Sequence, residues 1–196
     1  MRKRSVTVVI PTLPHRGDML SDALKSVREQ IVPPDGVIVE PDLQREGAWV
    51  TRNRAMAQVD TEWTAFLDDD DMFLPHHIQF LTDMAEEHEL DFCWGWYYVI
   101  GGEDPFPFHR GKQYDPNSAH IFPIAVLART EMLHRALEEM GGFQPDPYGT
   151  GNWGIQDQPV WDHLIVNQKA RHRAFEEITW KWRHHGYNTS GCPGRY

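Results

Sequence analysis

The sequence has few cysteines and no long apolar run. Its 196 residues include two cysteines, Cys93 and Cys192, which form neither a CxxC pair nor a disulfide framework, so we expect reduced thiols. The apolar run nearest the N-terminus covers residues 6–10 and stops at Pro11. It is too short for a signal-peptide core of about 7–15 residues or a membrane-spanning helix of about 20. We therefore expect no membrane span and a cytoplasmic location.

Positive charge is also scarce. The chain has 19 Lys and Arg against 29 Asp and Glu, for a formal net charge of −10. This excess of negative charge argues against an extended surface that binds the phosphate backbone of DNA or RNA, so nucleic acid is not an expected partner. An acidic protein that binds an anion needs a local source of positive charge, such as a metal ion or a helix N-terminus.

Strand and helix patterns alternate along the chain. Strands are expected over residues 5–10, 37–39, 63–67, 92–100, 121–128 and 175–182. Helices are expected over residues 18–31, 48–58, 75–88, 131–140 and 159–167. Loops are expected over residues 101–119 and 141–154, with an irregular tail over residues 184–196. This alternation predicts an α/β fold, with a central, mostly parallel sheet flanked by helices. The length suits one domain over residues 1–196, with no linker that divides it.

The first three expected strands end in residues suited to binding. These ends carry Pro11-Thr12, the acidic stretch Glu40-Pro41-Asp42, and the run from Asp68 to Asp71. Ligands of open α/β sheets bind outside the carboxyl ends of the strands. We therefore expect these three segments to converge at one edge of the sheet.

The run of four aspartates predicts a divalent metal site. Consecutive carboxylates repel one another unless a cation or hydrogen-bond donors compensate, and Asp68 and Asp70 can point the same way. The alternative is that these acids solvate a loop and cap the helix that starts near Pro75. For Asp71 we prefer that capping interpretation.

Three segments in order resemble a known family. Val8-Val9-Ile10-Pro11-Thr12, then Arg52-Asn53, then Phe66-Leu67-Asp68-Asp69-Asp70-Asp71 resemble the nucleotide-sugar half of family 2 glycosyltransferases of the GT-A fold. The likeness covers about residues 5–82. It implies a single GT-A, Rossmann-like domain with its nucleotide-sugar half over about residues 1–100. The acceptor half and a closing tail would occupy about residues 101–196.

The resemblance also implies roles for individual residues. In that family an Asp-x-Asp (DXD) motif holds Mn²⁺ or Mg²⁺ against the donor diphosphate, which makes Asp70 the main metal ligand and places Asp68 at the ribose or the metal. The donor-binding residues that it implies are Pro11, Thr12, Glu40, Asp42, Arg52, Asn53, Asp68 and Asp69. The expected donor is a nucleoside diphosphate sugar, with a UDP-sugar as first choice.

Two of these assignments keep alternatives. The family usually ends its second strand with Asp-Asp-Gly-Ser, where an acid reads the nucleobase. Here Glu40 matches that acid if the strand is ungapped, and Asp42 matches it only after a slip, so both remain candidates. Arg52 and Asn53 would otherwise lie on a solvated helix face.

The second half carries a candidate general base. Gly141-Gly142-Phe143 and the later Gln156-Asp157-Gln158 are similar to the family's Gly-Gly-Phe and Glu-Asp segments, which implies that Asp157 is the base, with Gln156 in place of the usual Glu. The alternative is that Asp157 only precedes a helix and is favoured there by the helix dipole. Asp162 is the rival acid, one helical turn farther on.

The tail resembles a family ending in which a histidine returns to the metal and the following loop folds over the diphosphate. His185 is preferred over His184 as that ligand, since a neutral imidazole suits a divalent ion beside carboxylates. His76 and His77, at the start of a helix, are expected at the surface.

These features together indicate a metal-dependent, inverting glycosyltransferase of the hexosyltransferase type, acting on an acceptor hydroxyl of unknown identity. One alternative is a non-catalytic nucleotide- or sugar-binding module on the same fold. Another is a sugar nucleotidyltransferase, although residues 12–17 hold one glycine where that class needs a Gly-rich phosphate loop. A third is a structural metal-binding protein.

Overall fold

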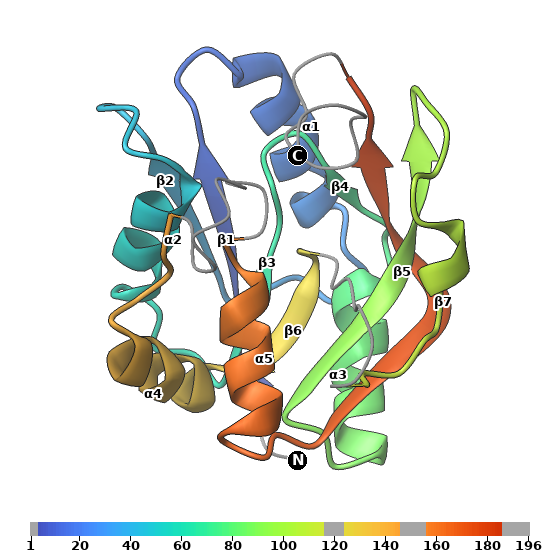
Figure 1. Ribbon diagram of the computed structural model, residues 1–196. Coiled ribbons are helices and arrows are strands. Elements are labelled where there is room, and N and C mark those ends of the chain that lie inside the picture. The colour runs from blue at the N-terminus through green and yellow to red at the C-terminus, as the bar shows by residue number, and fades with distance from the viewer. Residues whose placement is uncertain (1–3, 116–123, 146–155, 186–196) are drawn as a thin grey trace.

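The computed structural model describes residues 4–115, 124–145 and 156–185. Its strands are β1 (Val6–Thr12), β2 (Gly36–Pro41), β3 (Trp63–Phe66), β4 (Met72–Phe73), β5 (Phe92–Ile100), β6 (Val126–Arg129) and β7 (His172–Arg183). Its α-helices are α1 (Gly17–Arg28), α2 (Ala48–Met56), α3 (His77–Glu87), α4 (Thr130–Met140) and α5 (Gln158–Val166), and Pro107–His109 form a short 3₁₀ helix. The strands form one sheet in the order β2-β1-β3-β6-β5-β7-β4 (Figure 1).

Five of the seven strands run in the same direction. β1 pairs in parallel with β2 and β3, and β5 pairs in parallel with β7. β6 is antiparallel to both β3 and β5, so those two strands share a direction, and β4 is antiparallel to β7. The expected α/β class with a mostly parallel sheet is confirmed. As a result, the carboxyl ends of β1, β2, β3, β5 and β7 lie along one edge.

The sheet is covered on both faces by helices. Val8 and Val9 are adjacent on β1, and both side chains are fully buried. Val8 belongs to a core with α1 and α3, whereas Val9 belongs to a core with α2, α4 and α5. Figure 1 shows α5 crossing in front of the sheet. Burial on both faces explains why β1 is a continuous apolar run rather than an alternating one.

Several boundaries differ from the sequence expectation. Helix α1 ends at Arg28, and Ile31, which was expected to continue its apolar face, is 62% exposed. β7 begins at His172 rather than residue 175, and the two-residue strand β4 was not expected at all. Of the strand expected over residues 121–128, β6 occupies Val126–Arg129, and residues 121–123 lie outside the described part of the chain.

The expectation that His77 lies at the surface is wrong. Its side chain is completely buried, its ring stacks on Phe73 at a centroid distance of 3.8 Å, and its Nδ1 forms a 3.0 Å hydrogen bond with Oγ1 of Thr179. His77 thus joins the start of α3 to β4 and β7. Burial, helped by the nearby His76 and opposed by the Thr179 bond, lowers the pKa of His77 to about 3.

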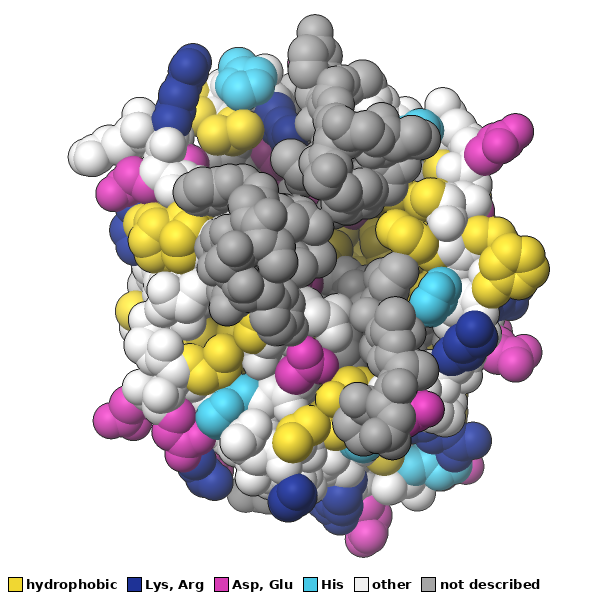
Figure 2. All heavy atoms as spheres, viewed as in Figure 1, with side chains coloured by type: hydrophobic (Ala, Val, Ile, Leu, Met, Phe, Trp, Pro, Cys, Tyr) yellow, Lys and Arg dark blue, Asp and Glu magenta, His cyan; other side chains and the backbone are white. Residues whose placement is uncertain are grey.

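The described surface mixes charges of both signs. Figure 2 shows basic and acidic side chains interspersed around the rim of one face. Within the described residues, no helix has the length and apolar character needed to cross a bilayer.

Candidate active site

Three carboxylates meet directly after β3. One oxygen each from Asp68, Asp70 and Asp71 lies within 4.8 Å of the others. The side chains of Asp70 and Asp71 are largely buried, at 8% and 2% residue exposure. Buried like charges at this separation need a cation or donors to balance them. The cluster offers the hard oxygen ligands that divalent ions prefer.

The capping interpretation of Asp71 is wrong. Helix α3 starts at His77, and its N-cap residue, His76, forms no side-chain capping bond. Asp71 instead accepts a 2.9 Å hydrogen bond from the backbone N–H of Arg183, the last residue of β7. A hydrogen bond therefore joins the aspartate segment to the end of β7, more than 100 residues later in the chain.

That same strand end delivers His185 to the cluster. A 3.0 Å hydrogen bond joins Nε2 of His185 to Oδ2 of Asp70. The neighbouring His184 donates its backbone N–H to Ile100 and places its ring beside Trp182. The structure therefore brings together the two residues that the sequence predicted as metal ligands. The rest of the tail, residues 186–196, lies outside the described part.

Asp69 points to a different set of partners. Its Oδ2 accepts hydrogen bonds from Oγ1 of Thr12 at 2.7 Å and from the backbone N–H of Leu13 at 3.2 Å. Its Oδ1 accepts one from Nη1 of Arg16 at 2.7 Å, and that nitrogen also lies 3.0 Å from Oδ2 of Asp70. Thr12 was among the residues expected at this edge, whereas Arg16 was not. The available signal was an arginine four residues beyond the end of β1, at the sheet edge where the aspartates were expected.

Arg52 and Asn53 are adjacent on α2 but make different contacts. Arg52 is 6% exposed, and its Nη2 donates a 2.9 Å hydrogen bond to Asp68. The alternative of a solvated helix face is therefore wrong for Arg52. Asn53 accepts from the backbone N–H of Phe143 at 2.8 Å and donates to its carbonyl at 3.0 Å. A Cβ at Gly142 would lie 2.8 Å from the Asn53 amide, so this turn needs glycine.

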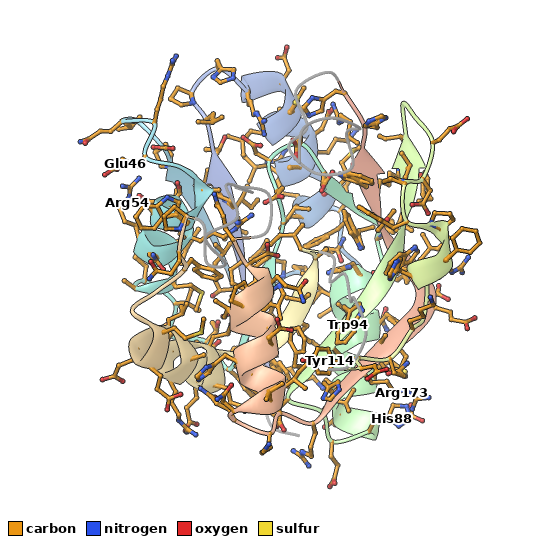
Figure 3. All side chains as sticks on the ribbon, viewed as in Figure 1. Glu46, Arg54, His88, Trp94, Tyr114 and Arg173 are labelled. Carbon is orange, nitrogen blue, oxygen red and sulfur yellow. The ribbon has the colours of Figure 1, made fainter. Side chains whose placement is uncertain are left out.

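The two nucleobase candidates at the end of β2 both have protein partners. Glu40 accepts a 2.9 Å hydrogen bond from Nε of Arg54. Asp42 is 3% exposed and accepts bonds from the backbone N–H groups of Glu46 and Gly47, which closes the loop before α2. Figure 3 shows Glu46 and Arg54 next to each other on this side of the molecule, where they form an ion pair. Pro11 lies opposite Glu40 in the β1–β2 register.

Asp157 is the residue immediately before α5, and its charge acts on both Asp68 and Arg52. Its carboxylate makes no capping hydrogen bond to the helix, and its Oδ2 accepts a 3.0 Å bond from Nε1 of Trp161. Trp161 is fully buried and packs edge-on against Phe66 of β3. The buried indole therefore fixes the direction of the carboxylate. Asp162 bonds with Gln158 and with Tyr114 instead.

The charge of Asp157 acts on Asp68 of the aspartate cluster. Burial raises the pKa of Asp68 to about 6; Asp70 and Asp157 also raise it, and Arg52 lowers it. Burial, followed by the charges of Asp70 and Asp68, raises the pKa of Asp71 well above its ordinary value. The carboxylates therefore resist ionising together, which is the condition that a bound cation relieves.

Comparison with known proteins identifies a matching family model and similar folds. The model of the family "Glycosyl transferase family 2" matches residues 18–144. That span includes Asp68 to Asp71 and excludes Thr12, Asp157 and His185. No curated protein sequence matches the chain.

The fold is similar to that of TarS from S. aureus. The TarS 1–349 structure with UDP has a TM-score of 0.73 and 18% identity, over 92% of this chain and 60% of that one. The same fragment with UDP-GlcNAc has a TM-score of 0.71 and 15% identity, over 94% and 60%. The chain thus spans 60% of the TarS fragment. This likeness establishes the GT-A fold.

Proposed function

The chain belongs to glycosyl transferase family 2, and from this premise we propose that it transfers a sugar from a nucleoside diphosphate donor to an acceptor hydroxyl. The observation that carries the proposal is the cluster of Asp68, Asp70 and Asp71, which His185 contacts. The carboxylate of Asp157, held by the Trp161 indole, is near enough for its charge to act on Asp68. The TarS structures with UDP and with UDP-GlcNAc favour testing a uridine donor first.

The donor set of the cluster fits a divalent cation. Carboxylate oxygens suit both Mn²⁺ and Mg²⁺, and an imidazole nitrogen favours Mn²⁺. We assign Asp70 and His185 as the main ligands, with Asp68 and Asp71 close enough to complete the set. When bound, such an ion supplies positive charge beside the departing diphosphate.

Asp157 is assigned as the general base. Its carboxylate would accept the proton of the acceptor hydroxyl while that oxygen forms a bond to the anomeric carbon of the sugar. The bond from the anomeric carbon to the diphosphate oxygen breaks, and its electron pair leaves with the diphosphate. A single displacement of this kind uses no covalent enzyme intermediate and inverts the anomeric centre.

The protein framework around the base supports this role. Trp161 donates to one carboxylate oxygen of Asp157 and is itself locked by packing against Phe66 and Phe143. Asn53 holds the backbone of Phe143 from α2. The base is thereby oriented through α5 and α2 together, and fixed orientation is a large part of catalytic rate enhancement.

The test starts with the donor and then removes the base. A thermal-shift panel of UDP, GDP, TDP and CDP with Mn²⁺ identifies the nucleotide, because a ligand at about 100 times its Kd adds about 2.7 kcal/mol of stability. With the matching nucleotide sugar, release of the diphosphate is then measured in wild type, Asp157→Asn and the control Asp162→Asn.

Asp157→Asn should keep nucleotide affinity while diphosphate release falls about 100-fold or more, the usual contribution of a positioned base. Asp162→Asn, an equal charge change on the same helix, should stay near the wild-type rate. A wild-type rate in Asp157→Asn contradicts the assignment, and so does a product with retained anomeric configuration. Tight nucleotide binding without transfer or hydrolysis of any donor would indicate a non-catalytic binding module instead.

A further inference from the structure

A single guanidinium bridges two carboxylates of the aspartate run. Nη1 of Arg16 lies 2.7 Å from Oδ1 of Asp69 and 3.0 Å from Oδ2 of Asp70. The arginine side chain keeps 20% of its surface exposed, whereas Asp69 keeps 4%. Arg16 is therefore the more solvent-exposed partner in this bridge.

The bridge is held in place by the loop that carries it. The second oxygen of Asp69 accepts bonds from Thr12 and from the backbone of Leu13, four and three residues before Arg16. The Arg16 backbone N–H also bonds the carbonyl of Leu13. Asp69 is thus engaged on both oxygens by one short segment, which fixes the approach of Arg16 to Asp70.

Arg16 contacts Oδ2 of Asp70, the oxygen best placed to bind a metal ion together with His185. Oδ2 of Asp70 is the atom that also contacts His185. An arginine is charged at all working pH values. Its positive charge next to that oxygen repels a divalent cation and occupies one of the oxygen's lone pairs. Arg16 and a metal ion therefore compete for the same carboxylate oxygen.

We propose that Arg16 sets the metal affinity of this site by competing with the divalent cation for Asp70, and that it makes metal and nucleoside diphosphate bind cooperatively. This rests on the proposed function. A donor diphosphate gives the guanidinium a second anionic partner, since arginine pairs well with phosphate oxygens. The exchange releases Asp70, so the metal binds more tightly once the diphosphate is present.

The experiment measures Mn²⁺ binding directly, without turnover. The electron paramagnetic resonance signal of free Mn²⁺ is titrated with wild type, Arg16→Gln and the control Arg54→Gln, first without nucleotide and then with saturating UDP. Arg54→Gln removes the same charge from an ion pair with Glu40 and Glu46 outside the cluster (Figure 3). Circular dichroism confirms the fold of each variant.

Without nucleotide, Arg16→Gln should bind Mn²⁺ about tenfold or more tightly than wild type, whereas Arg54→Gln should stay within about twofold, because exposed charges are screened. Saturating UDP should tighten Mn²⁺ binding about tenfold or more in wild type and distinctly less in Arg16→Gln. The wild-type measurement needs no variant, so the proposal remains testable even if Arg16→Gln does not fold.

The outcomes separate the inference from the function it rests on. Equal Mn²⁺ affinity in wild type and folded Arg16→Gln, or weaker affinity in the variant, overturns the role of Arg16 alone. Absence of any effect of UDP on Mn²⁺ affinity in wild type also overturns it. If neither protein binds Mn²⁺ with or without UDP, both the metal site of the proposed function and the role of Arg16 are wrong.

Discussion

His77 should make the protein less stable in mild acid by an amount that can be calculated. Its ring is enclosed between Phe73 and Thr179, and its Nε2 is buried with no hydrogen-bond partner among the described residues. A proton on that nitrogen would be a buried charge without a counter-ion. This burial is the main reason that the pKa of His77 falls to about 3.

The sign follows from proton uptake by the two states. Unfolded His77 has the ordinary histidine pKa of about 6.5, so between about pH 6.5 and pH 3 the unfolded state binds a proton that the folded state refuses. The free energy of unfolding therefore falls as the pH falls. At pH 5 the loss is about 2 kcal/mol, from about 1.5 pH units at about 1.36 kcal/mol each.

Other groups contribute in the opposite direction. Burial raises the pKa of Asp68 to about 6, so the folded state takes up a proton there before the unfolded state does, and this contribution grows as the pH falls. The pH dependence of the wild type alone therefore does not isolate His77. A comparison between variants does, because Asp68 contributes equally to each.

The assay is urea unfolding at pH 7.5 and pH 5.0 for wild type, His77→Gln and the control His88→Gln. His88 is exposed near Arg173 on the surface (Figure 3). The loss of unfolding free energy on going to pH 5.0 should be about 2 kcal/mol smaller in His77→Gln than in wild type. His88→Gln should lose as much as wild type. If His77→Gln loses as much as wild type does, the reasoning from burial is refuted.

Two further predictions concern the site. UDP binding should require a divalent cation and should be weakened most by Asp70→Asn, because diphosphate and carboxylates repel without a cation between them; calorimetry that gives equal affinity with EDTA and with Mn²⁺ would contradict this. Trp161→Phe should lower the transfer rate about tenfold or more at unchanged UDP affinity, because Asp157 loses a charged hydrogen bond worth about 1.5–3 kcal/mol. Steady-state kinetics checks it, and an unchanged rate would show that the indole does not orient the base.

Local sequence patterns were enough to place most of the elements in order and to predict the edge of the sheet at which the candidate site residues meet. The apolar run of β1 and the helical periodicity of α1 are local patterns, so they can be recognised without knowing what packs against them. Right-handed crossovers then place the ends of β1, β2 and β3 together. For that reason Thr12 and the aspartate run could be assigned to one site in advance.

Which side chains are in contact depends on how distant segments pack together. β4 has two residues and therefore no periodicity to detect. Its pairing with β7 nevertheless brings the end of β7 to the aspartate run. His185 and Asp70 are thereby in contact although 115 residues separate them in the sequence. The burial of His77 and the bond of Arg16 to Asp69 and Asp70 likewise depend on how distant segments pack. Local patterns specify an element and its buried face. The partners of that buried face are specified only when the sheet assembles. The contacts join residues far apart in the sequence, and no periodic pattern links such residues.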